Sequence, residues 1–295
     1  MYHGILNEYK EPGYPSHDVV ARLRGICRQK KIGHTGTLDP DAVGVLPVCL
    51  GNATRLCDML TDRRKEYVAD FRLGITTDTQ DLSGRVLEER QVLASPSQVK
   101  EAVFSFLGDS LQVPPMYSAL KVGGKKLCDL ARAGKEVERL PRPITIYSIE
   151  ILRQEHPDYR IRVSCSKGTY IRTLCHDIGG LLGCGGVMSG LKRTRVGEFR
   201  AEEAYTLEEL QRRSDEGRLQ EAIIPVEEMF REYPGFWALE ADYRALQNGN
   251  QIKTGAGFLD GEKVRMYSHE GIFYGVYRYD REKKLLAPVK MFLPE

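Results

Sequence analysis

Residues 30–47 of the chain read KKIGHTGTLDPDAVGVLP. Two lysines lead into a loop that is rich in glycine, and an apolar run follows it. The glycines permit positive φ or close backbone approach, and Pro40 biases Asp39 towards an extended conformation. The segment therefore predicts a carboxylate presented at a fixed bend. The alternative is an ordinary turn, because Asp and Pro are both common turn formers.

Nearby and distant cations favour a functional loop over an ordinary turn. Lys30, Lys31 and Arg55 supply charge that attracts phosphate. Arg172 falls in the first turn of a helix expected after residues 166–170, where a cation next to the positive end of the helix dipole is unfavourable without an anionic partner. The pattern around Arg172 thus predicts a bound carboxylate.

Residues 33–47 resemble the signature of the TruB family of pseudouridine synthases, the bacterial enzymes for position 55 in the T-loop of tRNA. The resemblance implies that Asp39 is the catalytic nucleophile and that His34 lies where the target base is flipped out. Further family-like motifs follow in the same order along the chain. They are KEY at 65–67, PPMYSALK at 114–121, GTYIRTL at 168–174 and LKRTRVGEF at 191–199.

The resemblance also gives roles to the residues of these motifs. Arg172 would form an ion pair with Asp39, Tyr67 would stack on the flipped uracil, and Leu191 would line the base pocket. Phosphate or RNA contacts are expected from Lys10, Lys31 and Lys121. Without the resemblance, Tyr67 reads as a core aromatic and Lys121 as a solvent-exposed lysine. The N-terminal motif departs from the family pattern at residues 11–15, which leaves the role of Lys10 open.

Composition indicates an ordinary protein with a buried core. The 295 residues are 41% apolar and 28% charged, with a net charge of +2 that does not by itself indicate a nucleic-acid binder. Lys and Arg outnumber Asp and Glu by seven to three over 121–147 and by nine to four over 153–200, whereas 201–232 hold four against ten. A basic body that attracts RNA phosphates is expected before an acidic segment.

The seven cysteines are scattered without a Cys-x-x-Cys pair, so the spacing suggests neither zinc nor a redox couple. Reduced cysteines, an early run of charges and the lack of a long apolar stretch predict a cytoplasmic protein with no membrane contact. Asp78 and Asp81 could form a metal pair, but two carboxylates without further ligands favour a turn or hydrogen-bond network. We therefore expect no metal.

Hydrophobic periodicity predicts the elements. Residues 4–10, 66–74, 144–151 and 159–164 read as strands, the last two as a hairpin, and helices are expected from Ser16 and after the capping boxes at Ser95 and Thr206. We predict an α/β (α+β) catalytic domain over 1–230, built on a mixed, largely antiparallel sheet, with an RNA-gripping insertion near 121–143. Short strands over 231–295 predict a small β-barrel, and the resemblance implies a PUA-like RNA-binding module there.

The predicted reaction isomerises uridine to pseudouridine by base flipping and an aspartate nucleophile, on tRNA, without guide RNA and as a monomer. No group is lost and no redox change occurs, so no cofactor is needed. An arginine close to Asp39 is expected to lower the pKa of that carboxyl. The alternatives are a non-catalytic RNA-binding protein and a guide-RNA-dependent relative of the dyskerin type.

Overall fold

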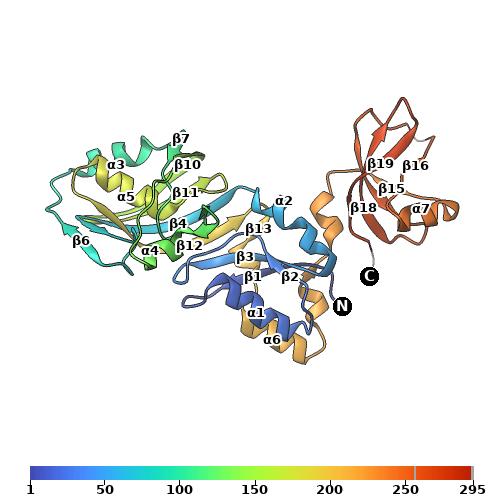
Figure 1. The fold of residues 1–295 in the computed structure, drawn as a ribbon, viewed down its shortest axis with the longest axis horizontal. Coiled ribbons are helices and arrows are strands. Elements are labelled where there is room, and N and C mark those ends of the chain that lie inside the picture. The colour runs from blue at the N-terminus through green and yellow to red at the C-terminus, as the bar shows by residue number, and fades with distance from the viewer. Residues whose placement is uncertain (256, 294–295) are drawn as a thin grey trace.

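The computed structural model describes residues 1–255 and 257–293, and ten strands of this part form one large sheet (Figure 1). The strand order is β14-β1-β3-β12-β4-β11-β10-β7, with β2 paired to β3 and β13 to β12. The bounds are β1 Gly4–Lys10, β2 Ile32–His34, β3 Val43–Leu50, β4 Lys65–Leu73, β7 Gly108–Gln112, β10 Arg142–Glu155, β11 Asp158–Cys165, β12 Gly186–Val196, β13 Phe199–Arg200 and β14 Ile223–Ile224. In this described sheet β3 and β12 pair in parallel and the other pairings are antiparallel. The predicted mixed, largely antiparallel sheet is confirmed.

Strand β4 shows why the sheet forms as it does. Its buried residues alternate with residues of the opposite face, and Tyr67, Ala69 and Phe71 all point into the core. This period of two is the pattern that the sequence predicted for a half-buried strand. The predicted hairpin also forms, because β10 and β11 pair antiparallel from Glu155 and Asp158 onward.

Helices cover the sheet in two groups (Figure 1). The bounds are α1 Ser16–Ile26, α2 Cys57–Thr61, α3 Pro96–Phe104, α4 Leu127–Arg132, α5 Ile171–Leu181, α6 Leu207–Asp215 and α7 Tyr243–Gln247. Helices α1 and α6 lie together against β1 and β3, and their apolar residues share one buried cluster with these strands. Helices α3 and α5 pack against β4, β10 and β11 in a second cluster. The capping boxes predicted at Ser95 and Thr206 are both present.

A second, five-stranded sheet follows the large one and curls beside α7 (Figure 1). Its strands are β15 Gly235–Trp237, β16 Ile252–Lys253, β17 Lys263–Tyr267, β18 Phe273–Asp280 and β19 Leu285–Met291. This arrangement confirms the predicted PUA-like fold. Phe230 joins the two parts, because its ring lies 5.8 Å from that of Phe292 and 6.2 Å from that of Phe273.

Two short hairpins project from the large sheet. They pair β5 Ile75–Thr77 with β6 Val86–Glu89, and β8 Lys121–Val122 with β9 Lys125–Lys126. The second hairpin and α4 occupy the basic excursion predicted near 121–143. Among the described residues, no helix has the length and apolarity needed to cross a bilayer.

Candidate active site

The loop between β2 and β3 presents Asp39, and a tight approach between strands fixes where the loop ends. Gly44 has φ +105°, and a Cβ built on it would lie 2.2 Å from the carbonyl oxygen of Arg193 on the parallel strand β12. A side chain at this position would therefore collide with the neighbouring backbone. Within the loop, the Ala42 N–H donates to the Asp39 carbonyl at 3.1 Å. Asp39 thus lies at a constrained bend, as the sequence predicted.

Lys10, at the end of β1, supports the Asp39 loop through hydrogen bonds to its backbone. Its ammonium is fully buried and donates to the carbonyl oxygens of Pro40 and Ala42 at 2.7 Å each, and to that of Glu11 at 3.0 Å. All three ammonium protons are thereby used by backbone carbonyls. This geometry corrects the expected RNA contact of Lys10, because a buried ammonium with three internal partners cannot reach a phosphate.

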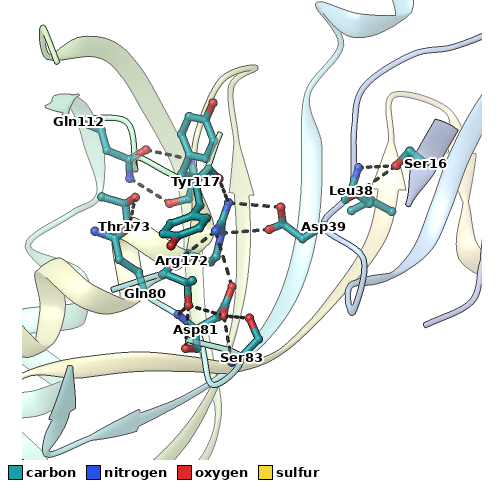
Figure 2. Close-up of polar contacts among 12 residues, drawn as sticks. Ser16, Leu38, Asp39, Gln80, Asp81, Ser83, Gln112, Tyr117, Arg172 and Thr173 are labelled. Atoms are coloured by element: carbon teal, nitrogen blue, oxygen red, sulfur yellow. Dashed lines mark hydrogen bonds and ion pairs between the residues drawn. The ribbon is translucent and has the colours of Figure 1, made fainter. Parts of the chain in front are cut away.

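Ser16 and Arg193 also support the loop. The Ser16 hydroxyl accepts from Leu38 N–H at 2.9 Å and donates to Leu38 O at 3.1 Å, directly before Asp39 (Figure 2). Ser16 is the first residue of α1, where the helix was expected to begin, and Pro15 is the N-cap. The buried Arg193 guanidinium donates from Nε to Val45 O at 2.7 Å and from Nη2 to Gly36 O at 3.2 Å.

Arg172 faces Asp39 across the site, which confirms the predicted ion pair (Figure 2). Its Nε lies 3.0 Å from Asp39 Oδ2, and its Nη2 donates to Asp39 Oδ1 at 3.2 Å. The guanidinium is positioned by Tyr117 O at 2.9 Å and Thr79 O at 3.2 Å, and its side chain is only 5% exposed. A nearly buried, two-point contact fixes the orientation of both groups.

Asp81 is a second carboxylate at this guanidinium, and sequence reasoning did not predict it. Its Oδ2 lies 3.6 Å from Arg172 Nη1, while its Oδ1 accepts from the hydroxyls of Thr79 and Ser83 and from Ser83 N–H. The network interpretation of the polar turn is confirmed for Asp81. Among the described residues, no group of three or more His, Cys, Asp or Glu could hold a metal ion.

The pKa of the Asp39 carboxyl is raised from its usual value of 3.8. Desolvation is the largest cause, and the Arg172 guanidinium opposes it without cancelling it, while Asp81 adds a further increase. Arg172 does lower the pKa of Asp39, as expected, but burial outweighs this contribution and the net pKa is raised. The side chain of Asp39 is still 37% exposed, so the carboxylate is not sealed from solvent.

Tyr67 and Arg193 face the same side of neighbouring strands. They pair in register between β4 and β12, as do Ala69 and Leu191. Desolvation raises the pKa of Tyr67, so its phenol is neutral at physiological pH. The sequence predicted Leu191 as a residue of the base pocket but did not point to Arg193, although the period of two places residues 191 and 193 on one face of the strand.

The remaining predicted residues are His34, Lys31 and Lys121. His34 ends β2, its Nδ1 accepts from Gly36 N–H at 3.3 Å, and burial is the largest cause that lowers its pKa, which favours the neutral ring. Lys31 and Lys121 are exposed. Lys121 lines a groove with Lys125, Lys126 and Lys135. The RNA contacts of Lys31 and Lys121 stay predictions.

Comparison with known proteins places this geometry in context. The family model described as "TruB family pseudouridylate synthase (N terminal domain)" matches residues 24–171, and that of the "tRNA pseudouridylate synthase B C-terminal domain" matches 172–231. The chain is 49% identical to tRNA pseudouridine synthase B of Lachnoclostridium phytofermentans, over 98% of this chain and 99% of that protein. It is 41% identical to the protein of the same name from Bacillus licheniformis, over 99% of this chain and 98% of the relative.

Solved structures agree with the sequence matches. A chain of an H/ACA RNP bound to a substrate RNA containing 2'-deoxyuridine aligns with a TM-score of 0.71 at 28% identity, covering 99% of this chain and 86% of that one. A chain of a Cbf5-Nop10-Gar1 complex aligns with the same TM-score at 30% identity, over 99% and 85%. The fold is that of a pseudouridine synthase. Within that class, the chain belongs to the TruB family.

Proposed function

We propose that this enzyme isomerises uridine to pseudouridine at position 55 in the T-loop of tRNA, without guide RNA. The observation that carries the proposal is the partly exposed Asp39 carboxylate, held on a constrained loop against the buried Arg172 guanidinium. The relatives that match over almost their whole length are named tRNA pseudouridine synthase B, which favours tRNA as the substrate.

Asp39 acts as the nucleophile in this proposal. The reaction breaks the N-glycosidic bond and joins the same sugar to C5 of the base, so it needs an ionised carboxylate that can attack C6 of the base or C1′ of the ribose. Arg172 keeps the carboxylate oriented and opposes its protonation. A neutral Tyr67 forms one wall of the base pocket, with Leu191 beside it on the neighbouring strand.

The target base must leave the RNA stack to reach Asp39, which costs a few kcal/mol. Stacking of the flipped uracil on Tyr67 returns about 1–3 kcal/mol per base. A neutral His34 fills the vacated space without placing a second charge beside the base. Flipping therefore needs no external energy source. Lys31 and Lys121 contact RNA phosphates in this proposal.

The chain is proposed to act as a monomer in the cytoplasm, with residues 1–230 as the catalytic domain and 231–295 as an RNA-binding module. The end of the large sheet at β14 and the start of the five-stranded sheet at β15 support this division. The alternative function is guide-dependent catalysis, which the likeness to a chain of an H/ACA RNP favours. The names of the full-length relatives outweigh that likeness.

The test uses unmodified tRNA transcript carrying tritium at C5 of uridine. We expect the wild type to release tritium without any other RNA, and Asp39→Asn to bind the transcript without releasing tritium. Asp41→Asn is the matched control, because it removes an exposed carboxylate from the same loop and should keep the activity. If folded wild type binds the transcript and releases nothing, the guide-independent enzyme is excluded.

A further inference from the structure

Cys49 and Cys57 lie close together beside strand β2, which leads into the Asp39 loop. Cys49 lies on β3 directly opposite Gly33 of β2. Cys57 begins α2, and a Cβ built on Gly33 would lie 3.3 Å from its sulfur. Because residues that face each other across two antiparallel strands share one face of the sheet, both sulfurs lie on the same side of β2 and β3.

The two thiols influence each other. Their side-chain interaction is the largest cause that raises the pKa of Cys49 and lowers that of Cys57. Cys49 is fully buried, whereas Cys57 is partly exposed. Burial and the Asp58 carboxylate oppose the lowering of the Cys57 pKa, and Lys290 adds to it, so that the net pKa of Cys57 is lowered. An accessible sulfur with a lowered pKa is the form of cysteine that attacks a disulfide, and a neighbouring thiol can then resolve the product.

The other cysteines lack this combination, and all seven lie among the described residues. Four are buried and their pKa values are raised, with desolvation as the largest cause: Cys27, Cys165, Cys175 and Cys184. Cys128 is partly exposed like Cys57, but its sulfur contacts the Asp129 carboxylate instead of a second thiol. The sequence spacing gave no sign of a redox couple, because eight positions separate Cys49 from Cys57 and the fold brings them together.

We propose that Cys57 and Cys49 form a reversible dithiol–disulfide site whose oxidant is a small-molecule disulfide. The Cys57 thiolate attacks one sulfur of that disulfide, so a mixed disulfide forms and one small thiolate leaves. Cys49 then loses its proton and attacks the Cys57 sulfur, which forms the Cys49–Cys57 bond and expels the second small thiolate. The two protein thiols give up two electrons and two protons, and one small disulfide becomes two thiols.

The test treats folded wild-type protein with millimolar oxidised glutathione and then blocks free thiols with N-ethylmaleimide under acid quench. Tryptic cleavage after Lys31, Arg55 and Arg63 places Cys49 in peptide 32–55 and Cys57 in peptide 56–63. We expect a linked pair of these peptides, two hydrogens lighter than their sum, which dithiothreitol separates. Cys128 should carry only glutathione in the same sample.

Three variants sharpen the result. Cys57→Ser should abolish the linked pair, Cys49→Ala should leave Cys57 bound to glutathione, and Cys128→Ser should give the same linked pair as the wild type. The proposal is overturned if wild-type Cys57 keeps glutathione while Cys49 is alkylated, or if Cys57 stays free while Cys128 reacts. Because the wild type alone decides between these outcomes, the test does not depend on how the variants fold. It is also independent of the isomerase activity.

Discussion

Glu8 should make the stability of the protein depend strongly on pH. Its side chain is completely buried on β1, two residues before Lys10, and no described residue donates a hydrogen bond to either carboxyl oxygen. Burial raises the pKa of Glu8 from 4.5 to about 8, and the cations of Lys10 and Arg193 oppose this only in part. The folded state therefore binds the Glu8 proton more tightly than the unfolded chain does.

The sign and size of the effect follow from these two pKa values. The stabilisation is complete below pH 4.5, where both states are protonated, and is lost as the pH rises through about 8. At about 1.4 kcal/mol per pKa unit, the shift from 4.5 to about 8 corresponds to a loss of about 5 kcal/mol in the free energy of unfolding. About 2–3 kcal/mol of this loss falls between about pH 5 and pH 7. Glu8→Gln removes this loss because an amide does not ionise.

The assay is urea unfolding of wild type and Glu8→Gln at several pH values, followed by far-UV circular dichroism. Fluorescence would be less suitable, since the single tryptophan, Trp237, lies in the five-stranded sheet. We expect the advantage of the variant in unfolding free energy to grow by about 2–3 kcal/mol from about pH 5 to pH 7. Glu101→Gln, at an exposed position on α3, is the control because Glu101 does not contribute to the pKa of Glu8. A constant difference between Glu8→Gln and wild type across this range would refute the reasoning.

Three further predictions concern the loop. Asp81→Asn removes a negative charge that raises the pKa of Asp39, so the acid limb of the kcat/KM profile should move to lower pH; an unmoved limb would show that the two carboxylates are not coupled. Lys10→Met removes three hydrogen bonds to backbone carbonyls, and we expect it to lower the free energy of unfolding by roughly 3–5 kcal/mol, measured by thermal unfolding. We also expect kcat to fall more than tRNA affinity does, measured in separate kinetic and binding assays. Gly44→Ala should lower the free energy of unfolding by more than about 3 kcal/mol, because its Cβ would lie 2.2 Å from a carbonyl oxygen. Gly134→Ala, at φ +68° in open space, should lower it by only about 1–2 kcal/mol. Equal losses for the two variants would contradict the clash at Gly44.

Local patterns were sufficient to predict much of this fold. The period of two in residues 66–74 and the capping boxes at Ser95 and Thr206 depend only on neighbours in sequence, and each forms as predicted. The Asp39–Arg172 pair was also predicted, because a cation in the first turn of α5 needs an anion and the family resemblance supplied Asp39.

The errors arose where burial decides the chemistry. Lys10 lies in a sequence that reads equally well as an exposed basic strand end, and only the packing of the loop over β1 shows that its ammonium is enclosed. The pKa of Asp39 likewise depends on how much water the folded site excludes, which outweighs the nearby guanidinium. Asp81 and the Cys49–Cys57 pair were missed because their partners come from other parts of the chain.

The supports of the Asp39 loop have a consequence for protein synthesis. The loop is held by Lys10 and Ser16 from the beginning of the chain, and by Arg172 and Arg193 from more than 130 residues later. A ribosome makes Asp39 long before it makes the two arginines. The nascent chain therefore carries Asp39 without its guanidinium partner until α5 and β12 have emerged, and the ion pair at this loop forms only late in translation.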